Sequence, residues 1–413
     1  MRSSYPTRPI LSVLAFLPVA VAQASPLTLD QAVALAQQRM PAAQSAAAGV
    51  RSADAGLDVA RLRPNPVLNI EAENVLGSGP YAGFGGGEKT YSMSLPVELG
   101  GKRDARIAVA RAERDFAGIG AVAARAEITL RITLACTAAA AAERRLAVAQ
   151  EELALAERGA HVAGERVDSG KASPIERQRA QVILTNAQVK RERMARAAST
   201  ASKALARLLD VAEPVMLAAP WFDEAGMYTP ATPAQAALLP VAAADAQVAA
   251  ARARSAAARS ARVPDLVVTA GTRRFGDSRD SAAVLGLSIP LPLFNSGSAE
   301  LARSRAELDR AEAERSAVAR DAAQAFDDSQ ADVADTQAAA AAATGPALDA
   351  ASEAARIARI GYAEGKFSQL DLIEAERSLA ETRATAIDAL AALHEARARL
   401  LRLQGSSAPL YKE

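Results

Sequence analysis

The sequence predicts a mainly α-helical fold with a smaller β portion, in which one unit of two strands and several long helices occurs twice. Helix-type spacing of apolar and charged residues runs through residues 103–168 and again through 297–362, with almost no proline. Short segments of alternating polarity precede both stretches. Three motifs also recur in the same order at a shift of about 195–200 residues, so we interpret the chain as a duplication.

The N-terminal residues 1–24 are typical of a cleaved export signal. Arg2 and Arg8 supply positive charge, Ile10–Ala22 is a short apolar core, and Ala22-Gln23-Ala24 is a small-x-small cleavage site. A retained membrane anchor is the alternative, but the core is too short to span a bilayer. The mature chain is expected to begin near Ser25, and no later stretch is long and apolar enough for a transmembrane helix.

Composition and charge argue against several classes of protein. The chain is 50% hydrophobic but only 4% aromatic, which favours closely packed long helices over a compact globular core. A net charge of +1 gives no sign of a nucleic-acid partner. The single Cys136 makes no intrachain disulfide, and His161 and His394 are too few for a zinc enzyme. We therefore expect no enzyme activity, no cofactor and no metal site.

The recurring motifs divide the chain into two units. The paired motifs are residues 63–68 with 263–268, 94–97 with 288–291, and 166–171 with 361–366. In the first unit, 25–209, we expect helices at about 27–62, 103–168 and 173–209 and strands at about 66–76 and 90–97. In the second unit, 241–403, we expect helices at about 241–262, 297–362 and 368–403 and strands at about 265–275 and 283–291. We expect a proline-rich connector at 210–240, which would be an equatorial region if the two units form one elongated molecule, and a C-terminal tail at 404–413.

Tight turns are expected at the ends of both long helices. The first turn has a glycine stop at Gly170, a serine N-cap at Ser173 and proline at the first helical position. The second turn has Gly365 and Ser368 in the same roles. At 1.5 Å per residue, each long helix would extend for roughly 95 Å. Helices of that length suit a tube or coiled coil rather than a globular domain.

The four short segments alternate between an apolar and a polar face. In the first, Leu68 and Ile70 oppose Asn69 and Glu71. Hairpins with one face on a soluble core would alternate in the same way. The export signal and the lack of transmembrane helices favour a membrane β-barrel wall between lipid and water. Four strands are too few to close a barrel, so several chains would have to share one.

Taken together, the export signal, the duplicated units and the two Gly-Lys turns resemble the TolC-type outer membrane efflux family, from about Leu27 to Leu403. Residues 73–80 and 98–103 are similar to its cobalt–zinc–cadmium resistance branch. The resemblance implies a homotrimer with a twelve-stranded barrel in outer-membrane lipid and a periplasmic α-helical tunnel. It also implies a periplasmic adaptor (membrane fusion protein), a proton-driven inner-membrane pump of the RND type, and export of divalent cobalt, zinc or cadmium.

The family's entrance pattern, Gly-basic-x4-acidic-x2-acidic, is matched by Gly365, Lys366, Asp371 and Glu374, with glutamate in place of aspartate at the last position. Residues three apart on a helix share a face, so Asp371 and Glu374 would form two stacked acidic rings in a trimer. In the first unit, Glu176 matches the first acidic position, while Arg179 stands at the second.

Glu176 and Lys366 of neighbouring hairpins are expected to form an entrance latch, and Gly170, Lys171 and Gly365 are expected to lie at the tips that contact the adaptor. The alternative is that these charged side chains have no role at an entrance and are ordinary solvated residues at helix ends. At the other end of the long helix, Gly100 and Gly101 are expected to form the strand-to-helix bend. The adjacent Lys102 and Arg103 are positioned to contact lipid headgroups, and one carboxylate, Glu98, does not make a metal site.

Two other functions fit the same features. A drug or protein secretion channel of the same family would share every helix and strand, because the wall of a wide tunnel need not bind its cargo. A soluble periplasmic coiled-coil adaptor or scaffold would keep the long helices but fold its hairpins into a small globular domain. The sequence leaves open the cargo, the identities of adaptor and pump, and the resting state of the entrance.

Overall fold

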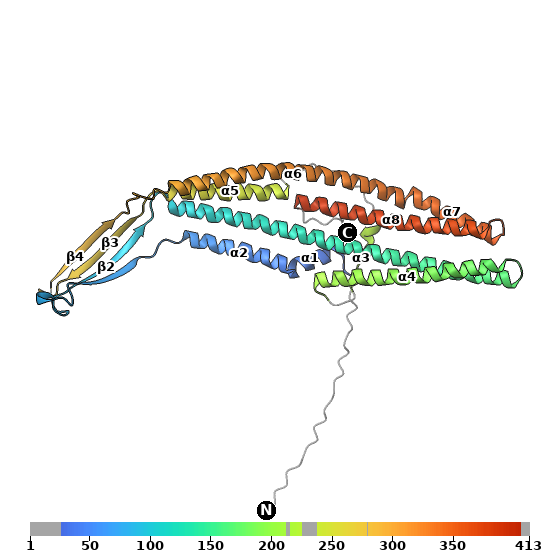
Figure 1. The fold of residues 1–413 in the computed structure, drawn as a ribbon, viewed down its shortest axis with the longest axis horizontal. Coiled ribbons are helices and arrows are strands. Elements are labelled where there is room, and N and C mark those ends of the chain that lie inside the picture. The colour runs from blue at the N-terminus through green and yellow to red at the C-terminus, as the bar shows by residue number, and fades with distance from the viewer. Residues whose placement is uncertain (1–25, 212–214, 225–237, 279, 406–413) are drawn as a thin grey trace, which may run out of the picture.

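The computed structural model describes residues 26–211, 215–224, 238–278 and 280–405. The molecule is long and narrow, with a four-stranded sheet at one end and the turns of two helix hairpins at the other (Figure 1). The export signal predicted at 1–24, the start expected at Ser25 and most of the tail at 404–413 lie outside the described residues. Within the described part of the chain, no helix has both the length and the apolar character needed to cross a bilayer.

The first repeat contributes four helices. They are α1 Leu29–Arg39, α2 Pro41–Arg61, α3 Lys102–Asp168 and α4 Pro174–Leu209. The single helix expected at about 27–62 is wrong, because the helix is divided at Met40, whose ψ of 133° is extended. Pro41 explains the division: its ring disfavours a helical conformation in the preceding residue, and proline suits the first position of a new helix.

The second repeat also contributes four helices. They are α5 Leu239–Ser260, α6 Ser298–Thr344, α7 Pro346–Ala363 and α8 Gln369–Gln404. Here the single helix expected at about 297–362 is divided at Gly345, and Pro346 begins the second piece. The same sterics apply as at Pro41, so each repeat contains one proline-defined break, although on different helices.

Helix α3 is the longest helix of the described chain and contacts helices of both repeats. It has 67 residues, which corresponds to roughly 100 Å of helix. It packs against α2 and α4 of its own repeat and against α5 and α8 of the other. Small buried residues such as Ala139, Ala140 and Ala141 let the neighbouring backbones approach closely, which explains why few aromatic side chains are needed.

The strands form one antiparallel sheet in the order β1-β2-β3-β4. They are β1 Val67–Glu73, β2 Glu88–Val97, β3 Leu266–Arg274 and β4 Ser281–Ser288. Two strands end earlier in the structure than the sequence predicted. β1 stops before Asn74, whose φ of 54° is left-handed, and β4 stops before Pro290, which has no N–H for a ladder. Pairing of β2 with β3 joins the two repeats, and β1 and β4 are the outer strands.

The sheet has two chemically different faces, as the alternation predicts. Ile70 lies opposite Tyr91, and Leu68 lies opposite Met93, on a face whose side chains are largely exposed. On the other face, the Asn69 amide donates to Ser94 Oγ at 2.9 Å, and Ser94 Oγ lies 2.9 Å from Thr269 Oγ1. Arg273 extends this polar network toward the far end of the sheet through ion pairs with two glutamates.

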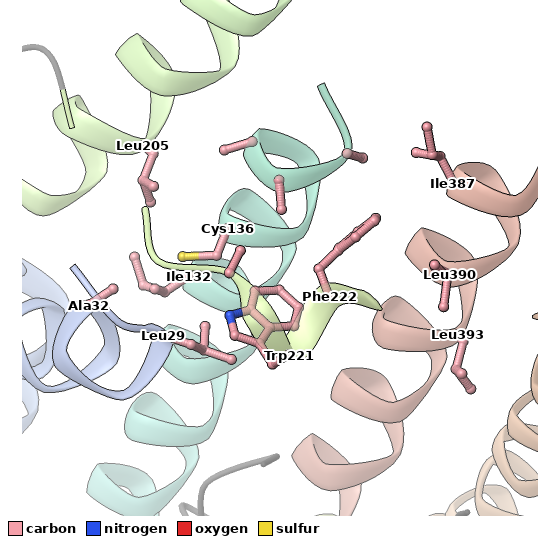
Figure 2. Close-up of a cluster of buried hydrophobic side chains, with 14 of the residues drawn as sticks. Leu29, Ala32, Ile132, Cys136, Leu205, Trp221, Phe222, Ile387, Leu390 and Leu393 are labelled. Carbon is pink, nitrogen blue, oxygen red and sulfur yellow. The ribbon is translucent and has the colours of Figure 1, made fainter. Parts of the chain in front are cut away.

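The connector supplies the aromatic core of the helical part. Trp221 and Phe222 lie in the short 3-10 helix η2 (Pro220–Asp223), with only 5% and 0% of their surface exposed. They pack among α1, α3, α4 and α8 beside Leu29, Ile132 and Leu393 (Figure 2). Part of the proline-rich connector is therefore packed into the helical core, whereas residues 212–214 and 225–237 of the connector lie outside the described part.

Candidate functional site

The two hairpin turns, at the end of the molecule opposite the sheet, have matching geometry. Gly170 and Gly365 adopt left-handed φ values of 71° and 75°. The N–H of Lys171 donates to the Arg166 carbonyl at 2.8 Å, and the N–H of Lys366 donates to the Gly361 carbonyl at 2.8 Å. These bonds satisfy carbonyls that the ends of α3 and α7 leave unpaired. The turns that the sequence motifs paired therefore have the same fold.

The start of α8 is fixed by a reciprocal cap. Ser368 Oγ accepts from the Asp371 N–H at 3.3 Å, and Asp371 Oδ2 accepts from the Ser368 N–H at 2.9 Å and from its hydroxyl at 2.7 Å. The hydrogen bonds from the Ser368 hydroxyl and N–H hold the pKa of Asp371 below its usual value. Asp371 is therefore a capping residue as well as a candidate ring residue, a role that the sequence reading missed although Ser-x-x-Asp was its signal.

Both predicted ring residues are exposed on the first turns of α8. Among the described residues neither Asp371 nor Glu374 forms an ion pair within the chain. The next acidic residue, Glu376, behaves differently, because Arg359 of α7 donates to its two carboxylate oxygens through Nε and Nη2. Asp371 and Glu374 thus keep their negative charge available to solvent or to a neighbouring copy.

The predicted latch residues do not meet within one chain. Lys366 Nζ lies 2.6 Å from Glu364 Oε2, in an exposed pair at the turn itself. Glu176 is half-buried, and its Oε2 is buried with no hydrogen-bond partner. Such an atom is costly to leave unpaired, so Glu176 is the less solvated member of the proposed pair.

Two residues that the sequence placed only within a repeated motif, and not at the site, connect the hairpins. The guanidinium of Arg166, at the end of α3, stacks on the ring of Tyr362, at the end of α7, with 5.1 Å between guanidinium carbon and ring centre. Burial raises the pKa of the Tyr362 hydroxyl, and the nearby Glu176 carboxylate acts in the same direction against the opposing charge of Arg166. A lone arginine and a lone tyrosine on separate helices give no sequence signal of this contact.

A groove of about 1000 Å³ separates the α3/α4 hairpin from the α7/α8 hairpin. Apolar side chains such as Leu155, Ile183 and Leu372 line it, and both Lys171 and Gly365 lie at its end. Its rim is charged: Lys190 Nζ lies 2.7 Å from Glu152 Oε2. An apolar floor with a charged rim is the arrangement found where proteins dock on one another.

At the strand-to-helix bend, charged residues neutralise one another within the chain. Gly100 and Gly101 have φ values of 67° and 71°. Arg106 binds the Glu98 carboxylate, and Lys102 Nζ lies 2.8 Å from Asp265 Oδ1. The guanidinium of Arg103 donates to the Arg61 carbonyl at 2.7 Å. Glu98 and Lys102 are thus used in ion pairs within the chain, rather than presented to metal or lipid.

The histidines and the cysteine have structural environments. His161 is exposed beside Glu165, and His394 is buried with Nε2 2.9 Å from the Phe222 carbonyl. Cys136 is buried, and burial raises the pKa of its thiol to about 12. In the described ranges, no group of three or more histidine, cysteine, aspartate or glutamate side chains is arranged to hold a metal ion.

Comparison with known proteins gives one consistent result. Residues 32–210 and 234–406 match the family described as Outer membrane efflux protein. The chain is 30% identical over 393 residues to the cobalt-zinc-cadmium resistance protein CzcC of Cupriavidus metallidurans, covering 92% of this chain and 91% of that one. It is 35% identical over 304 residues to the nickel and cobalt resistance protein CnrC of the same organism, covering 71% of each. The fold resembles the outer membrane protein VceC of Vibrio cholerae with a TM-score of 0.71, at 21% identity over 91% of this chain and 96% of that one.

Proposed function

The chain belongs to the outer membrane efflux protein family, and from this premise we propose that it is the outer-membrane channel subunit of a tripartite, proton-driven efflux system that exports divalent heavy-metal cations. The observation that carries the proposal is the match to CzcC along nearly the whole of both chains. Members of this family are efflux channels and not enzymes, so catalysis is not part of the proposal.

The proposed cargo rests on the relatives. CzcC is a cobalt-zinc-cadmium resistance protein and CnrC a nickel and cobalt resistance protein, so cobalt is common to the two names. Exposed Asp371 and Glu374 support a cationic cargo, because carboxylates near an aperture raise the local concentration of cations. We propose that these residues line the periplasmic entrance as acidic rings.

A homotrimer would complete the sheet. β1 and β4 are the outer strands of an open sheet, and each exposes a row of backbone groups that a bilayer cannot satisfy. Three copies joined edge to edge would make a closed barrel of twelve strands. The exposed apolar face, with Leu285 at 83%, would then contact lipid, and the helices would form a tunnel through the periplasm.

The groove between the hairpins is the proposed contact surface for a periplasmic adaptor, which would link the channel to an inner-membrane pump of the RND type. Lys171 and Gly365 line this groove, and Gly170 lies in the adjoining turn. We propose that Glu176 of one hairpin and Lys366 of a neighbouring copy hold the entrance shut. Lys366 would exchange its exposed partner Glu364 for the less solvated Glu176. The exposed Lys366–Glu364 pair contributes only about 0–1 kcal/mol, so its loss opposes this exchange weakly.

Deletion of the gene in its host tests the cargo. The deletion strain is expected to become sensitive to cobalt, zinc or cadmium and to regain resistance when the chain is expressed from a plasmid. A strain sensitive only to antibiotics would instead support a drug channel of the same family. Membrane extraction tests the architecture: the chain should resist carbonate and require detergent, and release by carbonate would support the soluble adaptor.

A further inference from the structure

The sheet carries two cations on its largely apolar face, at the end farthest from the helices. Lys89 of β2 lies directly opposite Arg274 of β3 in the ladder, and both side chains are exposed. Strand alternation places them on the same face as Tyr91 and Met93. The neighbouring Arg273 points to the opposite face, where it binds Glu73 and Glu88 at 2.9 Å each.

In the described part of the chain, Lys89 and Arg274 have no acidic partner. Like charges directly opposite each other on adjacent strands destabilise a sheet. The cations at the other end of the sheet are arranged differently, since Lys102 and Arg106 are both paired with carboxylates. A pair of unneutralised cations on this face is therefore complementary to an anion supplied from outside the chain.

The position of the pair identifies the kind of anion. Going from Lys89 toward the helices, the same face of β2 presents Tyr91, Met93 and Leu95, all of them exposed. From Lys89 to Val97, the last residue of β2, the strand extends for roughly 26 Å. At the tilt of roughly 35–45° typical of membrane strands this is about 20 Å across the bilayer, close to the apolar band of about 25 Å in membrane barrels. The cations are thus separated from the helix end of the sheet by about the height of the apolar band. They lie next to Tyr91, and tyrosine is enriched at the boundary between lipid tails and headgroups.

We propose that Lys89 and Arg274 form a docking surface for the phosphate of an anionic lipid headgroup, at the membrane boundary that faces away from the helices. The guanidinium offers two parallel donors to phosphate oxygens, and the ammonium adds a point charge. This inference rests on the proposed function, because it requires that the apolar face lies in a membrane.

The test uses the full chain purified in detergent and titrated with phosphatidylglycerol, with net-neutral phosphatidylcholine and inorganic phosphate as comparison ligands. Bound lipid is measured by mass spectrometry after detergent exchange. Lys89→Gln/Arg274→Gln should weaken phosphatidylglycerol binding about thirtyfold, and each single substitution about fivefold. The two comparison ligands should bind the native chain more weakly than phosphatidylglycerol does.

Two further variants separate charge at this site from charge in general. Arg51→Gln/Arg193→Gln removes two exposed arginines from α2 and α4 and should leave lipid binding unchanged. Lys89→Arg/Arg274→Lys keeps both charges and should retain binding, and it remains informative if the glutamine variants do not fold.

Four results would overturn the proposal: native affinity in Lys89→Gln/Arg274→Gln, an equal loss in the α2/α4 control, equal binding of phosphatidylcholine, or equal binding of inorganic phosphate. A chain that needs detergent yet gives one of these results would refute the lipid docking surface alone. A chain that stays in solution without detergent would refute the proposed function as well.

Discussion

Buried His394 is held in its neutral form by the aromatic core. Its ring packs edge-on against Trp221, with centroids 5.0 Å apart, and contacts the Phe222 carbonyl through Nε2. Burial lowers the pKa of His394 to about 4, although the hydrogen bond to Phe222 opposes the shift. Of the charged groups that face it, Arg397 lowers the pKa further and Asp223 raises it.

This environment predicts a loss of stability in mild acid. Between pH 6.5 and pH 4 the unfolded histidine binds a proton that the folded chain excludes. The contribution of neutral His394 to the free energy of unfolding is therefore complete above pH 6.5 and is lost as the pH falls to 4. The shift corresponds to about 3 kcal/mol at most. His394→Gln keeps a donor but does not titrate, so its unfolding free energy in urea should fall less over this range. His161→Gln, an exposed control, should behave like the native chain; equal slopes for all three would contradict the prediction.

Asp371 combines a cap and a charge, and the two can be separated. Asp371→Asn retains an acceptor oxygen for the Ser368 N–H but loses the negative charge, whereas Asp371→Ala loses both. We expect Asp371→Asn to lower the cation selectivity of single channels while keeping native thermal stability, and Asp371→Ala to lower both. Glu374→Gln should lower selectivity alone. Unchanged selectivity in Asp371→Asn and Glu374→Gln would exclude the acidic rings.

The latch gives a separate prediction for a single side chain. Lys366→Ala removes the cation that is proposed to reach Glu176 of a neighbouring copy, and we expect it to raise the basal conductance of single channels. Glu364→Ala is the matched control, because it removes only the partner that Lys366 has within its own chain. Basal conductance that rises equally in both variants, or in neither, would argue against the latch.

At the scale of elements, the turn from β2 into α3 depends on two adjacent glycines with different surroundings. Both have left-handed φ values, so alanine at either position adds roughly 1–2 kcal/mol of strain. A Cβ on Gly101 would meet no atom within 4 Å, whereas one on Gly100 would lie 2.6 Å from Val263 Cβ and 3.1 Å from the Ser260 carbonyl. We expect Gly100→Ala to lower the melting temperature clearly more than Gly101→Ala in the same detergent; equal shifts would contradict this reading of the bend.

The order and type of the elements could be predicted from periodicity, but their ends depended on single residues. Pro41 and Pro346 divide two helices that the spacing of apolar residues joined, because the pattern continues across a break in the hydrogen bonds. Pro290 ends β4 early for the same kind of local reason. The turns at Gly170 and Gly365 were predictable because glycine there is a direct conformational requirement.

Less of the candidate site than of the fold could be predicted from the sequence. Gly365, Lys366, Asp371 and Glu374 were located by a motif, and the structure places them together at one turn. The stacking of Arg166 on Tyr362 joins residues of different repeats, and no short pattern encodes it. The use of Glu98 and Lys102 in ion pairs within the chain also depends on partners that only folding brings near.

At the scale of the whole molecule, the duplication produces one continuous body because both parts of the fold cross between repeats. β2 pairs with β3 in the sheet, and α3 packs along α8 in the helical part. Arg145 reaches Asp388 at 2.5 Å, and Arg383 reaches Glu151 at 2.7 Å, so ion pairs reinforce the same helix contact. The family predicted from the sequence is confirmed, whereas the trimer remains a prediction about the two free edges of the sheet.

The free edges predict where copies of the chain meet. Cys136, the single cysteine, is fully buried and its thiol is held protonated. Disulfide cross-links between chains would therefore form only through introduced cysteines. Asn69→Cys on β1, combined in turn with Ala282→Cys, Val284→Cys or Gly286→Cys on β4, places all thiols on the polar face of the two outer strands. Under mild oxidation at least one combination should give a covalent ladder ending at three chains. Ser92→Cys on the inner strand β2 should give none. Absence of cross-links from every combination, together with a detergent-corrected mass of one chain, would rule out closure of the sheet by copies of the same chain, because these strands have no other edge through which to close.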